Sequence, residues 1–214
     1  MITVSGLFDL EHTMAKEYLA GFEYPWQALE GIGDLILQLG LALGEDYRQV
    51  TPEVWVHGSA KVADTAFIAG PCIIGANTEI RPGAFLRGSI LVGENCVVGN
   101  STELKNCILF DGVQVPHYNY VGDSILGYKA HLGAGAVTSN VRGDKGLVTV
   151  QGIPTGRKKV GAMVGDFGEI GCGAVLNPGT VIGRNSQVYP LSCVRGVVGE
   201  NCIYKNSGEI VKKR

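Results

Sequence analysis

The sequence has no excess of charge of either sign. Its 214 residues include 18 Lys and Arg against 20 Asp and Glu, which gives a formal net charge of −2. Nucleic-acid-binding domains usually carry a basic surface, so this balance argues against a nucleic-acid partner. The length and the 45% share of hydrophobic residues suffice for one or two globular domains with a core.

Signals for export or membrane insertion are also missing. The first residues, MITVSGLFDLEHT, have neither the basic start nor the unbroken apolar stretch of a signal peptide. The longest apolar segment, DLILQLGLALG, is too short to cross a bilayer. We therefore expect a cytoplasmic protein with no membrane association.

The cysteines lack the spacing of a metal or redox site. The sequence contains no Cys-x-x-Cys pair, and no histidine lies near enough to complete a zinc site. Disulfides are also unusual in the cytoplasm. We interpret all six as small, buried apolar residues: Cys72, Cys96, Cys107, Cys172, Cys193 and Cys202.

Glycine, in contrast, is abundant, and a six-residue repeat accompanies it. The 32 glycines are about 15% of the chain, roughly twice the usual share of about 7%. The first run of aliphatic residues at a spacing of six is Val56, Val62, Ile68, Ile74, Ile80, Leu86, Val92, Val98 and Leu104. With two five-residue steps the pattern continues through Leu109, Val115, Val121, Leu126 and Leu132. It resumes at Val164, Ile170, Leu176, Ile182, Val188 and Val194, which makes twenty rungs.

A second position of each rung is constrained as well. Between Ala60 and Ala136, the residue four after the aliphatic one is small or aliphatic in thirteen of fourteen rungs, Ile108 and Ile125 included. The exception is Asn119. Neither a helix nor a hairpin meander has this period. It predicts a solenoid of short strands and turns in which both positions point inward and stack from coil to coil.

The repeat resembles the signature of the hexapeptide-repeat family over residues 54–137 and 164–206. That resemblance implies an all-β fold, a left-handed parallel β-helix, although parallel crossovers are usually right-handed. It also implies assembly as a homotrimer.

The rest of the chain departs from the repeat. Residues 1–53 have helical spacing, with Asp9 and Pro25 as helix starts, and we interpret them as a helical cap on the open first coil; partner binding is the alternative. Residues 138–163 form an interrupting loop whose basic segment GRKK, with Lys145, suits phosphate groups or simply faces solvent. The β-helix then extends over residues 54–206, and residues 207–214 form a basic tail.

Three residues break the rule of the repeat, and a histidine on a later rung adds a fourth group that is chemically useful. Arg81, Arg87 and Lys105 replace the usual Gly or Ala after the aliphatic residue, and His117 follows on a later rung. Cations bind phosphate, and an imidazole titrates near neutrality and can act as a general base. Solvated turn residues and an ordinary surface histidine are the alternatives for each residue taken alone.

Four segments give a closer resemblance. They match, in order and spacing, the acetyltransferase domain of the bifunctional glucosamine-1-phosphate N-acetyltransferases and uridylyltransferases, which make UDP-N-acetylglucosamine. The segments are IRPGAFLRG, VGNSTELKN, HYNYVGDSILG and HLGAGAVTSN. The L-x-A-G-x-G-T-R signature of the uridylyltransferase half is not found, and the 53 residues before the repeat are too few for that domain.

The resemblance implies a role for each matching residue. His117 is implied as the general base, and Asn140 lies near base and substrate. Arg81, Lys105 and Tyr120 are implied to bind the sugar phosphate. His131 stands where the family has a substrate-contacting asparagine, and the loop TSNVRG also departs from the family pattern, so the acceptor is open. The residues assigned to acetyl-CoA are Ala134, Lys158 and Lys159.

The implied reaction is direct acetyl transfer from acetyl-CoA to an amino-sugar phosphate or a nucleotide sugar. Two alternatives stay open. One is a non-catalytic protein of the same fold that binds sugar phosphates or nucleotide sugars. The other is a zinc enzyme resembling the γ-class carbonic anhydrases, for which the sequence offers only His117 and His131 near each other.

Overall fold

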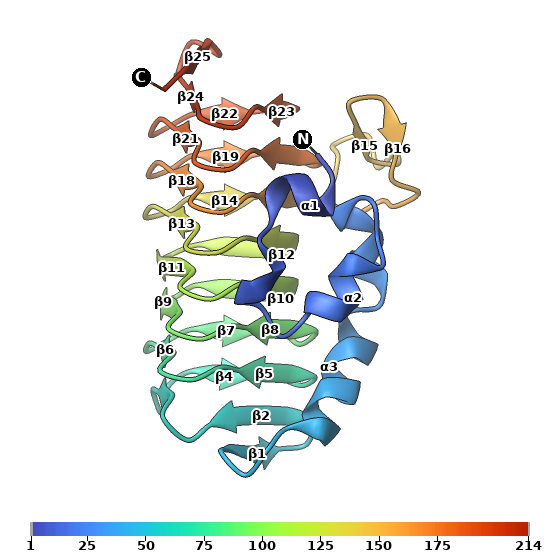
Figure 1. The fold of residues 1–214 in the computed structure, drawn as a ribbon. Helices are drawn as coiled ribbons and strands as arrows, with labels where there is room; N and C mark the ends of the chain where they lie inside the picture. Colours follow the sequence, from blue (N-terminus) through green and yellow to red (C-terminus); the bar gives the residue numbers. More distant parts are fainter. Residues whose placement is uncertain (1, 214) are drawn as a thin grey trace.

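A computed structural model describes residues 2–213 and shows a three-sided stack of coils (Figure 1). Each coil adds a short parallel strand to each of three faces, which we name A, B and C. Face B alone contains eight parallel strands over residues 2–213, so the stack has about eight coils. The predicted left-handed parallel β-helix is confirmed. No helix of the described chain is long and apolar enough to span a bilayer.

Two long strands, β10 (Glu103–Leu109) and β12 (Tyr120–Leu126), begin on face C and end on face A. The other strands of face A are β2 (Val54–His57), β5 (Cys72–Ile74), β8 (Ile90–Val92), β17 (Ala162–Val164), β20 (Thr180–Ile182) and β23 (Val197–Val198). Face B is built from β3 (Lys61–Val62), β6 (Glu79–Ile80), β9 (Val97–Asn100), β11 (Gln114–His117), β13 (His131–Leu132), β18 (Glu169–Ile170), β21 (Gln187–Val188) and β24 (Cys202–Tyr204). Face C is completed by β4 (Phe67–Ile68), β7 (Phe85–Leu86), β14 (Val137–Thr138), β19 (Val175–Leu176) and β22 (Cys193–Val194).

The interior follows the predicted stacking for most rungs. The aliphatic positions Val92, Val98 and Leu104 have no exposed surface. The exceptional Asn119 also points inward and is only 2% exposed, because its amide donates to the carbonyls of Gly133 (2.8 Å) and Ala136 (3.0 Å). A buried amide is tolerated when its hydrogen bonds are made.

Ile108 and Ile125 do not point inward as the sequence predicts. Cys107 is in register with Ile90 and takes the inward place, so Ile108 is in register with Leu91 on the outer side of face A. The cause is the five-residue step, which shortens the corner by one residue and shifts the alternation of inward and outward side chains. The corner residues of these two steps, Asn106 (φ 47°) and Asp123 (φ 48°), have left-handed backbone conformations.

The N-terminal helices lie along face A rather than on the end of the first coil (Figure 1). They are α1 (Val4–Leu7), η1 (Leu10–His12), α2 (Lys16–Ala20), η2 (Pro25–Glu30) and α3 (Ile32–Ala42). Helix α3 packs on β5, β8 and β10, and η2 packs on β12. The first coil is instead covered by β1 (Tyr47–Thr51), which pairs antiparallel with β2. The outward residues of face A are apolar, and covering them is favourable.

Residues 139–161 leave the stack between β14 and β17 and project from it (Figure 1). They are not structureless, because β15 (Thr149–Val150) and β16 (Ile153–Pro154) form a small antiparallel hairpin. The basic segment after residue 206 includes β25 (Ile210–Lys212), which pairs antiparallel with β24 at the last coil.

Candidate active site

Most of the residues selected from the sequence lie on two edges of the stack. Corner BC, between faces B and C, contains residues 81–84, 99–102, 116–119 and 133–136. Corner CA, between faces C and A, contains residues 87–89, 105–106, 122–123 and 139–161. Face C lies between these two corners, and in each coil its strand leads from corner BC to corner CA.

His117 ends β11 at corner BC, with its side chain exposed. Its backbone is fixed on both sides: its N–H donates to Oδ1 of Asn119 (3.1 Å), and its carbonyl accepts from the N–H of Gly135 (3.0 Å). Within residues 2–213 the imidazole makes no hydrogen bond, so both ring nitrogens are accessible. A Cβ at residue 99 would overlap the carbonyl oxygen of Pro116, so this close approach of β11 to β9 requires Gly99.

Tyr120, in the same coil as His117, belongs to a polar network at corner CA. Nδ2 of Asn140 donates to the Tyr120 hydroxyl (3.2 Å) and to Oδ2 of Asp123 (2.6 Å). Nδ2 of Asn106 donates to Oδ1 of Asp123 (2.8 Å) and to the carbonyl of Leu29 in η2 (3.1 Å). Burial raises the pKa of Tyr120, so its hydroxyl keeps its proton. Asp123 is 4% exposed and was not selected from the sequence.

The cations do not form the single cluster that the sequence predicts. Arg81 lies at corner BC and pairs with Glu79 (3.2 Å). Arg87 lies at corner CA, where Nη1 is 2.6 Å from Oε1 of Glu103. Lys105 lies one coil above Arg87, at the same corner, and forms no ion pair within the described chain.

Corner CA therefore brings together Lys105, Tyr120 and Asn140, with Arg87 in the place that the sequence motif gives to Arg81. The signal for Arg87 was present in the sequence. Arg87 and Lys105 are 18 residues apart, which is three rungs, and three rungs return the chain to the same corner one coil higher.

The remaining predicted residues are divided between the two corners and face B. Ala134 is exposed at corner BC, in the coil above His117. His131 lies on face B, where Nδ1 is 2.8 Å from Oε2 of Glu169. Lys158 and Lys159 line a pocket of about 640 Å³ between the projecting segment and η2, and Asp123 also lines it. One chain thus keeps His131 away from the Tyr120 network, whereas Lys158 and Lys159 share a pocket with Asp123 of that network.

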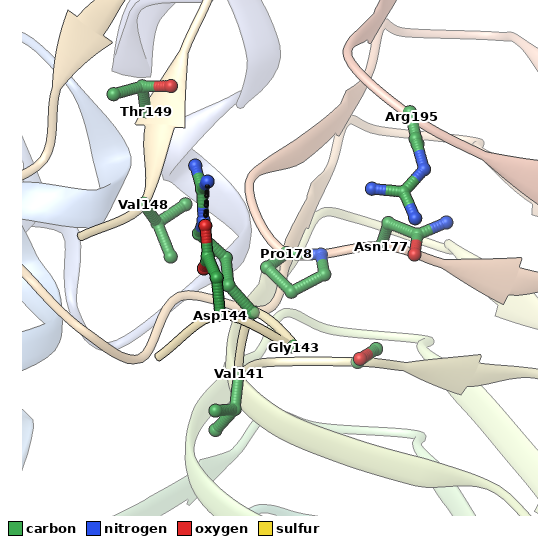
Figure 2. A pocket seen from close by; sticks show the side chains of 10 residues that line it. Val141, Gly143, Asp144, Val148, Thr149, Asn177, Pro178 and Arg195 are labelled. Atoms are coloured by element: carbon green, nitrogen blue, oxygen red, sulfur yellow. Dashed lines mark hydrogen bonds and ion pairs between the residues drawn. The ribbon is translucent and has the colours of Figure 1, made fainter. Parts of the chain in front are cut away.

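The described residues hold no group of three His, Cys, Asp or Glu side chains placed to bind a metal ion. A second polar pocket, shown in Figure 2, lies at corner CA beside Asn140, between the projecting segment and the upper coils. Sequence reasoning missed it, because its walls come from two separate segments, residues 139–149 and 177–195, that share no motif.

Comparison with known proteins finds relatives of the kind that the sequence motifs suggest. The family model described as the GMPPB C-terminal domain matches residues 68–153. The bifunctional sugar-1-phosphate nucleotidylyltransferase/acetyltransferase of Sulfurisphaera tokodaii is 30% identical over 217 residues, which cover 93% of this chain and 54% of that protein. The bifunctional protein GlmU of Methanococcus vannielii is 36% identical over 140 residues, 63% of this chain and 34% of that protein.

Among solved structures, the UDP-N-acetylglucosamine acyltransferase of Francisella novicida has a TM-score of 0.44 at 13% identity, covering 75% of this chain and 68% of that one. The chain spans about half the length, or less, of the curated relatives it matches. These relatives confirm the resemblance to the bifunctional sugar-1-phosphate nucleotidylyltransferase/acetyltransferases.

Proposed function

We propose that the protein transfers an acetyl group from acetyl-CoA to the amino group of an amino-sugar phosphate or a nucleotide sugar. One observation carries the proposal: the accessible imidazole of His117 lies at one edge of face C, and the polar group of Lys105, Tyr120 and Asn140 lies at the other edge. The name of the Sulfurisphaera tokodaii relative, a bifunctional sugar-1-phosphate nucleotidylyltransferase/acetyltransferase, supports it.

The acceptor is held at corner CA in this proposal. Lys105 has no carboxylate partner in the described chain, so its ammonium is available to a phosphate. Arg87, one coil below, adds a second positive charge that Glu103 shares. The Tyr120 hydroxyl accepts a hydrogen bond from Asn140, which leaves its own proton free to donate to a phosphate oxygen.

His117 then acts as the general base. The neutral amine of the acceptor attacks the thioester carbonyl, and His117 takes a proton from the amine nitrogen as the C–N bond forms. Backbone N–H groups stabilise the oxyanion. The C–S bond breaks, and the proton on His117 neutralises the departing thiolate of CoA. No step needs a cysteine nucleophile.

A homotrimer completes the site. Face C has apolar outward residues that the chain itself leaves partly exposed, including Phe85 (41%) and Phe67 (58%). A neighbouring copy on this face would bring its own corner residues toward Tyr120. In this arrangement His131 of the neighbouring copy contacts the acceptor, and Ala134, Lys158 and Lys159 contact acetyl-CoA. The product would be an N-acetylated sugar phosphate or nucleotide sugar, as in the biosynthesis of UDP-N-acetylglucosamine.

The test incubates the protein with acetyl-CoA and a panel of amino-sugar phosphates and nucleotide amino sugars, and follows the released thiol. We expect His117→Ala to reduce turnover by about 10²-fold or more. His57→Ala is the matched control, because His57 lies on the first coil, far from His117 along the stack, where its Nδ1 bonds to the hydroxyl of Ser59 (2.8 Å). His117 is exposed, so its replacement spares the core.

Turnover by His117→Ala within a few-fold of the wild type would rule out His117 as the base. Sugar-phosphate binding without thiol release from either protein, unchanged by His117→Ala, would instead identify a non-catalytic binding protein.

A further inference from the structure

The pocket of Figure 2 has a volume of about 510 Å³ and two dissimilar walls. Val141, Arg142 and Val148 come from the projecting segment, and Asn177, Pro178 and Arg195 come from the turns of the next two coils. None of these residues has a role in the acetyl transfer described above.

One positive charge in this pocket is not compensated. Arg142 forms two hydrogen bonds with Asp144, Nε to Oδ1 (2.9 Å) and Nη2 to Oδ2 (2.6 Å). These bonds, with a third from the N–H of Gly146, hold the pKa of Asp144 well below its usual range, so Asp144 stays charged and neutralises Arg142. Arg195 forms neither an ion pair nor a hydrogen bond within residues 2–213, and its guanidinium extends toward Asn177 (Figure 2).

The other lining groups suit a ligand that has hydroxyl groups and an apolar part as well as a negative charge. The hydroxyls of Ser139 and Thr149 make no hydrogen bond in the described chain. Asn177 donates its amide to the carbonyl of Val194 (2.8 Å), which leaves its Oδ1 free to accept. Pro178 and Val148 supply apolar surface. A phosphorylated nucleoside combines these three properties: phosphate, ribose hydroxyls and a planar base.

The pocket continues the acceptor site along corner CA. Lys105 is in register with Gly122, and the same column continues through Ser139 and Asn177 to Arg195. These four steps of about 4.8 Å place the two cations about 19 Å apart along the backbone. Asn140 lies midway, with its side chain on Tyr120 and its neighbours Ser139 and Val141 in the pocket wall.

From this arrangement we propose that the pocket binds the nucleoside phosphate portion of a nucleotide amino sugar, whose sugar-linked phosphate lies at Lys105 and Tyr120. This inference rests on the proposed function, and it selects a nucleotide sugar over a sugar monophosphate as the acceptor. A monophosphate at Lys105 is too short to reach Arg195. In a nucleoside diphosphate, the second phosphate extends along the column toward the Arg195 guanidinium, and the nucleoside lies in the pocket against Pro178 and Val148. CoA also carries a phosphorylated nucleoside, so the experiment separates the two sources.

The test measures binding of UDP, dTDP, GDP and CoA to the full chain by calorimetry, for the wild type, Arg195→Ala and Arg48→Ala. Arg48 is the matched control, because it is an exposed arginine on β1 at the opposite end of the stack. We expect Arg195→Ala to weaken binding of at least one nucleoside diphosphate by about tenfold or more, since a guanidinium forms two charge-assisted hydrogen bonds with phosphate. The affinity for CoA should be unchanged by Arg195→Ala. Arg48→Ala should change none of the four affinities.

In turnover, Arg195→Ala should raise KM for a nucleotide amino sugar by a similar factor and leave kcat within a few-fold. Equal diphosphate binding by wild type and Arg195→Ala, or weakened binding of CoA alone, would overturn the inference. Arg195-dependent diphosphate binding without thioester turnover would support the pocket and refute the proposed function. Turnover of sugar monophosphates without binding of nucleoside diphosphates would support the proposed function and refute the pocket.

Discussion

Faces A and C are both built from short parallel strands, but only face A is covered by other parts of the described chain. Both present a column of mainly apolar side chains on the outside of the stack. On face A, the column consists of Ile73, Leu91, Ile108, Ile125, Met163 and Val181, and none of these is more than 1% exposed. On face C, the equivalent positions include Phe67, Phe85, Val137 and Val175, all of which are partly or largely exposed.

The difference arises from residues 4–42, whose helices cover face A. No described element covers the outer side of face C. The repeat alone makes three similar faces, and the outward residue of each rung decides what each face contacts. Face B, with Lys61, Glu79 and Gln114 outward, suits solvent. Face C is apolar and borders both candidate site corners, so a second copy that covers it would also enclose the site.

The largest expected effect tests the two columns directly. Ile108→Ala removes a fully buried side chain under α3 and should lower the free energy of unfolding by about 2–5 kcal/mol. Val175→Ala, at the equivalent outward position of face C, should cost less than about 1 kcal/mol in the dissociated chain, because Val175 is only partly buried. Urea unfolding of both variants at low protein concentration makes the comparison.

Equal losses for the two variants at low concentration would contradict the distinction between a covered and an uncovered face. A cost for Val175→Ala that grows with protein concentration would sharpen it, because the assembled form would then bury that residue.

A smaller effect tests what fixes the N-terminal segment to the stack. Asp166, which is 3% exposed, accepts hydrogen bonds from the N–H groups of Asp9 (2.7 Å) and Tyr128 (2.9 Å) and pairs with Arg184 (3.2 Å). Asp166→Ala leaves these donors without an acceptor, so we expect a loss of about 2–3 kcal/mol. Limited proteolysis should then release residues 2–42 before it cleaves the coils.

Glu209→Ala is the control for Asp166→Ala. Glu209 forms an exposed ion pair with Lys205 on the last coil, so its removal should change stability by less than about 1 kcal/mol. An Asp166→Ala protein as stable and as protease-resistant as this control would show that the contacts of the Asp166 carboxylate do not hold the helices on face A.

The sequence predicted the solenoid because its period of six is local and matches no other regular structure. It did not predict where the helices lie, since that depends on the outward residues of face A, and the two five-residue steps hide the register of Ile108 and Ile125. The same limitation affected the site. Motif matching selected Arg81, whereas coil register places Arg87 beneath Lys105, and the pocket lined by Arg195 depends on contacts between distant segments.

The smallest expected effect concerns the point where the covered and uncovered faces meet. The side-chain amide of Asn106 donates to the carbonyl of Leu29 in η2, which is part of the N-terminal cover (residues 4–42), and to Asp123. Asp123 also accepts from Asn140, which donates to the Tyr120 hydroxyl on face C. The N-terminal cover is thereby connected to the proposed acceptor group through one buried carboxylate. Asp123→Asn tests this connection with little change in shape. Asparagine also tolerates the left-handed backbone of residue 123 (φ 48°).

Because an amide offers one acceptor oxygen where the carboxylate offers two, Asp123→Asn must place its NH2 group against the donor of Asn106 or Asn140. We expect the free energy of unfolding to fall by about 1 kcal/mol and the acceptor KM to rise by up to about tenfold, with a smaller change in kcat. Asp64→Asn, in an exposed turn, should change neither quantity. An unchanged KM in Asp123→Asn would mean that Tyr120 and Asn140 are positioned by face C alone, and that the cover on face A serves only stability.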